Sequence, residues 1–224
     1  MLADAISSSL PMSAGVALSP LPVAAILIIL MSARARTNAP AFLLGWVAGI
    51  LTIGFVVSLL PGLLTTQGEP TQLSAMIRVA LGVALLLLAG RQWRHRPRPG
   101  AAVKVPRILA RLDAIGVVQS SITGFLLSAI HPKNLILNVA GAAAIDASTL
   151  DSGTQYIALV IFALIASVGI TIPIATYFIA RRKVSATLDR WKDWLIRNNV
   201  HVMVVLLLIL GALLIARGLH FLLA

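Results

Sequence analysis

The stretch AFLLGWVAGILTIGFVVSLL, residues Ala41–Leu60, contains 20 residues and no charge. At a rise of about 1.5 Å per residue, a helix of this length crosses a bilayer core of about 30 Å. The remainder of the chain has the same character, because 59% of its 224 residues are hydrophobic and only 11% are charged. A soluble domain usually has about 25% charged residues. The sequence therefore predicts an all-α membrane protein, with no room for a sizeable extramembrane catalytic domain.

Five further apolar stretches predict membrane spans, at about 20 residues per crossing. Two of the six spans, the first and the fourth, are interrupted by proline and polar residues. We expect the first span to be retained, because it lacks the basic start and the small-residue cleavage site of a signal peptide. The predicted spans are Met12–Met31, Ala41–Leu60, Leu73–Gly90, Ile115–Ile145, Tyr156–Ala180 and Val202–Ala216.

The distribution of positive charge predicts the orientation of these spans. Fifteen of the 18 Lys and Arg residues lie in the loops after spans 1, 3 and 5, and the opposite loops, 61–72 and 147–155, contain none. By the positive-inside rule, both termini are outside. Two parts of the basic loops, near Ile108 and near Trp191, have amphipathic spacing, and we expect them to contact anionic inner-leaflet lipids. The net charge of +11 is thereby explained without a nucleic-acid partner.

Proline interrupts two spans at equivalent places. The motif Ser19-Pro20-Leu21-Pro22 lies in span 1, and His131-Pro132-Lys133-Asn134 lies in span 4. Each motif is in the first helix of a three-helix half, and because three is odd, the second half enters the membrane from the opposite side. The pattern predicts two inverted repeats, residues 1–111 with the basic loop and residues 112–224. Matched breaks in two halves indicate the binding site of a transporter.

The two breaks predict a site for an anion near the bilayer midplane. Proline favours the first position of a helix and a polar residue caps it, so each break is expected to start a second half-helix. The N-termini of the two half-helices would face each other, and free N–H groups there attract anions. Lys133 adds a full charge at a depth where a lysine costs about 2.5–3.5 kcal/mol. The predicted substrate-binding residues are Ser19, Pro20, Pro22, His131, Pro132, Lys133, Asn134 and Asn138.

Several of these residues also have a purely structural interpretation. Lys133 can instead snorkel to the interface or bind backbone carbonyls. Asn134 and Asn138 are one turn apart and can join helices, and His131 can be a helix cap rather than a proton carrier. These alternatives remain open at the level of sequence.

Small and basic residues in other spans suggest packing and surface contacts. Gly45, Gly49 and Gly54 favour close helix packing and would also permit a homodimer. Arg78 and Arg217 are expected to snorkel near the outer surface. The chain has no cysteine, no catalytic or nucleotide-binding motif and no carboxylate deep in a span. We therefore expect neither an enzyme nor a cofactor, and a metal-cation exporter is disfavoured.

The residues around both breaks resemble a known family. Leu18–Ile50 is similar to the first hairpin of the peptidoglycolipid- and sulfolipid-addressing branch of the LysE (lysine exporter) superfamily, and His131-Pro132-Lys133-Asn134-Leu135 resembles its Asn-Pro-Lys motif, with His131 in place of Asn. The resemblance implies a six-helix transporter of the bacterial cytoplasmic membrane that moves anionic or glycosylated envelope lipids. A proton-driven exporter of a small amino acid or similar solute is one alternative. A non-transporting scaffold of a lipid-export machine is another.

Overall fold

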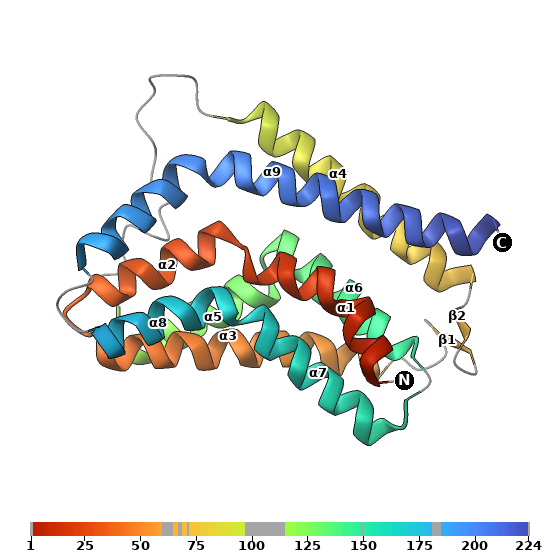
Figure 1. The fold of residues 1–224 in the computed structure, drawn as a ribbon, viewed down its shortest axis with the longest axis horizontal. Helices are drawn as coiled ribbons and strands as arrows, with labels where there is room; N and C mark the ends of the chain where they lie inside the picture. The colour runs from red at the N-terminus through yellow and green to blue at the C-terminus, as the bar shows by residue number, and fades with distance from the viewer. Residues whose placement is uncertain are drawn as a thin grey trace.

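The computed structural model describes residues 2–59, 65–66, 69–70, 72–96, 115–148, 150–180 and 185–223. These residues form an elongated helical bundle, with both termini at the same end (Figure 1). A short antiparallel pair of strands, β1 (Thr65–Thr66) and β2 (Glu69–Pro70), lies near that end. The helices are α1 (Leu2–Ala17), α2 (Pro20–Met31), α3 (Ala35–Ser58), α4 (Gln72–Arg94), α5 (Val117–Ala129), α6 (Pro132–Asp146), α7 (Ser152–Ala166), α8 (Val168–Ala180) and α9 (Ser185–Leu223).

The helices confirm a multi-pass membrane architecture. In the described ranges, three continuous segments are long and apolar enough to cross a membrane, namely Ala35–Ser58, Gln72–Arg94 and Asn198–Leu223. Two bent pairs, α1 with α2 and α7 with α8, bring the number of candidate spans to five. The predicted fourth span corresponds to α5 and α6, which have 13 and 15 residues, are each too short to cross alone and are not among these five candidates.

The bend between α7 and α8 was not predicted from the sequence. The two helices meet at Ser167 with an angle of 58°. Pro173 lies near the bend, inside α8; a proline in a helix has no N–H for the carbonyl four residues earlier and its ring clashes with that carbonyl. The carbonyl in question belongs to Gly169, just after the bend. Gly169 also lies against α1, where an added Cβ atom would be 1.9 Å from the carbonyl oxygen of Ala17.

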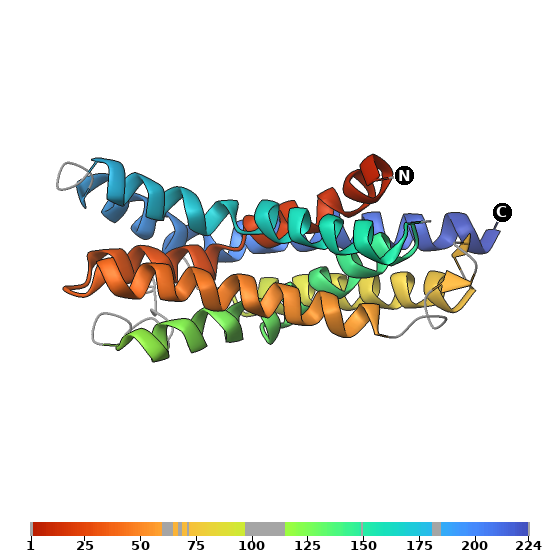
Figure 2. The ribbon, with the colours of Figure 1, turned by 90° about the horizontal axis from the view of Figure 1, so that it is seen from below.

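Helices α3 and α5 pack side by side through glycines (Figure 2). A Cβ atom added to Gly45 would be 1.9 Å from the Ser121 carbonyl oxygen, and one added to Gly124 would be 2.2 Å from the Phe42 carbonyl oxygen. Close backbone approach of this kind is the usual role of small residues in membrane helices. Gly49 makes a similar contact with Ser128, and Gly54 contacts Leu159 of α7. The glycines of the second span are therefore used for packing within the chain.

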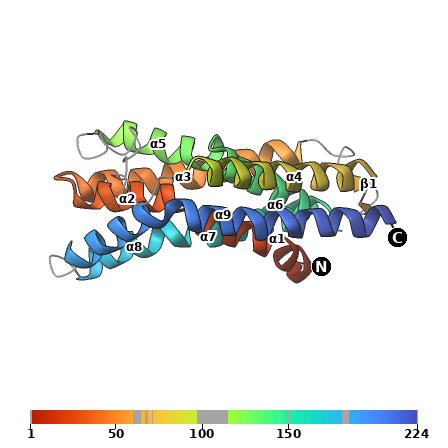
Figure 3. The same ribbon diagram turned by 90° about the horizontal axis from the view of Figure 1, so that it is seen from above.

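Helices α4 and α9 form a second close pair, visible from above in Figure 3. Gly82 and Gly211 face each other, because a Cβ atom on either one would lie within 3 Å of the other's carbonyl oxygen, at 2.7 and 2.9 Å. Gly218 contacts the carbonyl of Ala75 in the same way, at 2.8 Å. This spacing fixes the C-terminal part of α9 against the first half of α4.

The amphipathic segment near Trp191 is part of a longer element than expected. Helix α9 continues without a break from Ser185 to Leu223, and only Asn198–Leu223 has the apolarity of a span. Trp191 and Trp194, in the segment before Asn198, are exposed. Several sequence predictions lie outside the described residues, namely the boundary between the halves at 111 and 112, the amphipathic segment around Ile108, and the basic residues Arg98, Lys104, Arg107, Arg111, Arg181, Arg182 and Lys183.

Candidate functional site

The first span is broken where the sequence predicts it. Helix α1 ends at Ala17, Ser19 is the extended N-cap residue of α2, and Pro20 is the first residue of α2. The two helices are bent by 52°. Proline suits this position because its fixed φ fits the first helical turn and the missing N–H would have had no helical partner. At the break, the N–H of Ser19 donates to Val16 rather than to Gly15. The Gly15 carbonyl therefore does not receive the hydrogen bond that Ser19 would donate in a continuous helix.

The fourth predicted span is interrupted in the same manner. Helix α5 ends at Ala129, His131 is the N-cap residue of α6, and Pro132 follows as its first residue. The His131 side chain makes no capping hydrogen bond. The N–H groups of Ile130 and His131 both donate to the carbonyl of Leu126. As a result, carbonyl groups near the end of α5 need partners from outside their helix.

Lys133 joins the two breaks. Its ammonium nitrogen Nζ donates a hydrogen bond of 2.6 Å to the Gly15 carbonyl oxygen, and the residue is 1% exposed. The contact links the first turn of α6 to the last turn of α1. A cation is favourable there, because the end of a helix has a partial negative charge from its free carbonyl groups. Of the structural alternatives for Lys133, binding to a backbone carbonyl is the one observed.

Asn134 and Ser19 complete the junction. The Ser19 hydroxyl donates to the Asn134 side-chain oxygen Oδ1 at 2.7 Å, and Asn134 Nδ2 donates to the Leu127 carbonyl at 2.8 Å. One turn further along α6, Asn138 Nδ2 donates to the Ser128 carbonyl at 2.9 Å. Both amides bind carbonyls near the end of α5. Broken backbone within lipid needs such partners, because water is not available.

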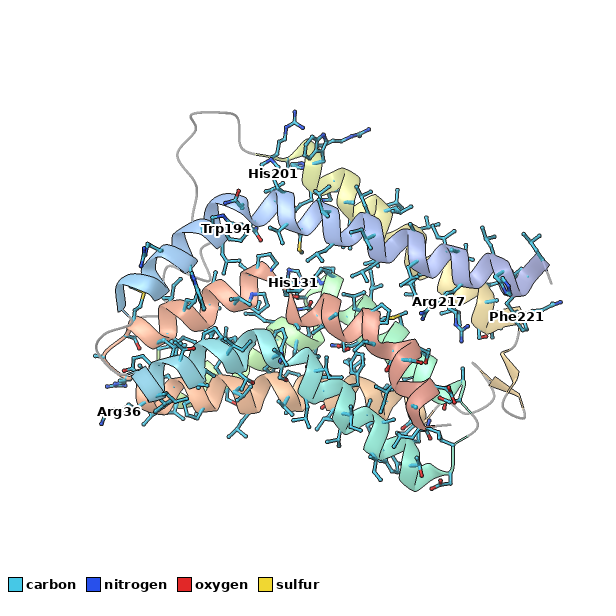
Figure 4. All side chains as sticks on the ribbon, in the orientation of Figure 1. Arg36, His131, Trp194, His201, Arg217 and Phe221 are labelled. Carbon is cyan, nitrogen blue, oxygen red and sulfur yellow. The ribbon has the colours of Figure 1, made fainter. Side chains whose placement is uncertain are left out.

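The predicted site residues are therefore only partly brought together. Ser19, Lys133 and Asn134 form one buried polar cluster, with Asn138 one turn away. Pro20 and Pro22 are buried in the first turn of α2, where they shape the break. Pro132, in contrast, is exposed, and His131 is half-buried (Figure 4). The Nδ1 atom of His131 and the Oδ1 atom of Asn138 are buried and have no hydrogen-bond partner among the described residues.

Other buried polar contacts were not anticipated from the sequence. Asn38 Nδ2 donates to the Ile115 carbonyl at 2.8 Å, and the Ser120 hydroxyl donates to the Asn38 carbonyl at 2.7 Å. These bonds fix the start of α3 to the start of α5. The sequence signal for this contact is an asparagine near the beginning of an apolar helix. Asparagine is common at the beginning of helices, so this signal does not identify a contact with α5.

A second polar region, also missed, lies between α1, α4, α6 and α9. A pocket of about 630 Å³ is lined there by Arg78 and Arg217 together with several apolar side chains. From the sequence, both arginines were expected to snorkel near the outer surface. Their helices are distant in sequence, so only the packing of α4 against α9 brings the two charges to one place. Among the described residues, no cluster of His, Asp or Glu has the arrangement of a metal site.

Taken with the fold, these features define an all-helical, multi-pass membrane protein with broken spans that meet at a buried polar junction. The sequence model of one family, described as Sap, sulfolipid-1-addressing protein, matches residues 10–220, and the chain belongs to this family. The match agrees with the resemblance found in the first hairpin. No curated protein and no solved structure matches the chain.

Proposed function

We propose that this protein exports or flips an anionic or glycosylated envelope lipid across the bacterial cytoplasmic membrane, with both termini outside. The observation that supports the proposal best is the Lys133 ammonium, buried where two broken spans meet. Family membership supports the lipid class, because the family is described as sulfolipid-addressing. Arg34 is the N-cap residue of α3, and Arg91 and Arg94 lie in the last turn of α4, at helix ends assigned to the inner side.

The junction has donors to offer to an anionic group. A lysine ammonium has three N–H donors, and among the described residues Lys133 uses one of them, to Gly15. The first turns of α2 and α6 meet at the Ser19–Asn134 hydrogen bond. Free N–H groups and a partial positive charge at the start of a helix favour anions.

Substrate access requires a change of conformation. Lys133 is 1% exposed, so the junction is closed to a ligand in this arrangement of the helices. The bent pairs α1–α2 and α7–α8 provide places where half-helices can tilt. We propose that the two three-helix halves, related as inverted repeats, rock against each other around the junction. In the proposed repeats, α7–α8 of the second half corresponds to α3 of the first half. Because α3 is continuous and α7–α8 is bent, the proposed symmetry is approximate.

Reconstituted vesicles containing only this chain provide the test. We expect transbilayer movement of a fluorescent sulfated glycolipid in vesicles with the wild-type chain. Lys133→Met, which keeps length and removes charge, should abolish this movement. Arg94→Gln, which removes an exposed charge on α4, should not. The thermal unfolding temperature of each variant in micelles separates loss of function from loss of fold.

Other outcomes would point to the alternative functions. Normal lipid movement by folded Lys133→Met would overturn the proposed role of Lys133. Movement of an amino acid driven by a pH gradient, without lipid movement, would indicate a small-solute exporter. Inactive wild-type vesicles, together with loss of export in cells when Arg181, Arg182 and Lys183 are neutralised, would indicate a scaffold.

A further inference from the structure

The pocket between α1, α4, α6 and α9 has the composition of a separate ligand site. It lies at the end of the bundle where both termini are found, as the positions of Arg217 and Phe221 in Figure 4 show. Its volume of about 630 Å³ is within the range of about 300–1,000 Å³ that is usual for small-molecule sites. The junction around Lys133 contributes none of the residues that line it.

Positive charge is concentrated on one part of this pocket. Arg78 of α4 and Arg217 of α9 both line it, on two helices that pack against each other. His220 and the carboxylate of Asp4 also line it. Two guanidinium groups that line one pocket repel each other electrostatically. An anionic ligand would remove this repulsion.

The framework holds the two arginines in place. Gly218, next to Arg217, lies against the carbonyl of Ala75, one turn before Arg78. Arg217 also donates a hydrogen bond of 2.7 Å to the Ser8 carbonyl of α1. In the described part of the chain no hydrogen bond from Arg78 is found. Since a guanidinium has five N–H donors, both side chains retain donors for the terminal oxygens of a phosphate or sulfate group.

The rest of the pocket is apolar. Met12, Leu214 and Phe221 supply large hydrophobic side chains, and Ala140 and Ala144 of α6 also line the pocket. A free inorganic anion would leave this surface without a partner. An alkyl chain would cover it and gain about 25 cal/mol for each Å² of apolar surface removed from water.

We propose that this pocket binds an amphiphile with a phosphate or sulfate ester head group, with the anion between Arg78 and Arg217 and the alkyl chain along Leu214 and Phe221. The inference goes beyond the proposed function, because it requires neither Lys133 nor transport. It assigns a lipid site at the end of the bundle opposite Arg36 (Figure 4).

Native mass spectrometry in a non-ionic maltoside detergent tests the assignment with hexadecyl phosphate as the probe. We expect hexadecyl phosphate to bind the wild-type chain more tightly than hexadecyl phosphocholine, which has the same chain and no net charge. Arg78→Gln should weaken binding about ten- to hundredfold, the usual effect of one charge-assisted hydrogen bond. Arg94→Gln, at the other end of the same helix, should leave binding unchanged. Arg217→Lys, which keeps the charge but loses the planar fork, should give an intermediate loss.

Three results would overturn the proposal. One is equal binding of hexadecyl phosphate by the wild-type chain and by folded Arg78→Gln. Another is equal affinity for hexadecyl phosphocholine, which would show that the alkyl chain alone determines binding. The third is competition by inorganic phosphate at the same concentration as hexadecyl phosphate, which would indicate a site for a free anion. Lys133→Met should bind hexadecyl phosphate normally, so failure of the transport proposal is distinguishable from failure of this one.

Discussion

The hydroxyl of Ser19 donates a 2.7 Å hydrogen bond to the side-chain oxygen of Asn134, across a separation of 115 residues in the chain. The bond joins the cap of α2 to the first turn of α6, and both residues are buried. The two broken spans are therefore connected directly at their breaks. Neither break depends only on its own helix for the partners of its polar groups.

A double-mutant cycle should detect this connection. We expect Ser19→Ala and Asn134→Ala to be coupled by about 0.5–1.5 kcal/mol in the free energy of unfolding, the usual net contribution of one buried hydrogen bond. Unfolding in mixed micelles gives the measurement. Ser32→Ala, at the far end of α2 with its own local hydrogen bond to Ile29, is the control and should combine additively with Asn134→Ala. Additive behaviour of the Ser19 pair as well would contradict a direct bond.

The facing glycines of α4 and α9 should be intolerant of larger residues. Gly82→Val places a side chain against the Gly211 carbonyl and should destabilise the fold by about 1–3 kcal/mol, the usual cost of overpacking. Gly90→Val is the matched control, because an added Cβ atom at Gly90 has nothing within 4 Å. Thermal unfolding in micelles compares the two. Equal unfolding temperatures for both variants would show that α4 and α9 do not pack in this register.

The bend at Ser167 should depend on Pro173. Pro173→Ala restores the N–H that can donate to the Gly169 carbonyl, so α7 and α8 should straighten. With 1.5 Å per residue, removing the 58° bend lengthens the separation between Ile157 and Ile179 by about 4 Å. The chain has no cysteine, so single cysteines at these two exposed positions can be spin-labelled and their distance measured.

Thr176→Ala is the control for the straightening experiment. It removes a hydroxyl that donates to Ile172 in the same helix and leaves Pro173 in place, so the label distance should not change. If Pro173→Ala also leaves the distance unchanged, the contact of Gly169 with Ala17 maintains the bend instead.

The start of α7 should be sensitive to acid. The Asp151 carboxylate accepts hydrogen bonds from the hydroxyl and the backbone N–H of Thr154, at 2.6 and 3.0 Å, and these bonds lower its pKa below the usual value. A lowered pKa in the folded state means that the cap is present at neutral pH and is lost as the pH falls through that pKa. Amide exchange at Thr154 should therefore accelerate in acid. In Asp151→Asn the exchange rate should lose this pH dependence, and an unchanged dependence would contradict the assignment.

The first turns of α9 should lie at the membrane surface. Trp191 and Trp194 are 44% and 57% exposed, and indole side chains prefer the interface between lipid and water. Quenching by lipids brominated at different depths should place both near the head groups, whereas Trp46, which is fully buried in the bundle, should be quenched weakly at every depth. Equal quenching of all three would argue against a surface location.

Most of the apolar spans and both proline breaks could be predicted from the sequence, for identifiable reasons. A membrane helix needs a long uncharged stretch, and proline in such a stretch has few tolerated places, so Ala41–Leu60 and the motifs at Pro20 and Pro132 could be recognised from local pattern. Family resemblance at the first hairpin was also correct. These features depend on residues that are close together in the chain.

Features that depend on distant residues could not be predicted in the same way. The hydrogen bond from Lys133 to Gly15 requires the end of α1 to lie beside the start of α6. The hydropathy of a sequence does not show which helices are neighbours. Arg78 and Arg217 were recognised individually, but their shared pocket follows only from the packing of α4 on α9. The bend at Ser167 was missed because Pro173, six residues away, lies inside an otherwise continuous apolar run.

Helix α9 has a mechanical consequence. Its 39 residues make a rod of about 58 Å, nearly twice the thickness of the hydrocarbon core. One end lies beyond the span, at the exposed Trp191 and Trp194, and the other carries Arg217 and Phe221 into the pocket. Because no break interrupts α9, the exposed tryptophans and the residues that line the pocket belong to one continuous helix. We therefore expect a change at one end of α9 to be felt at the other.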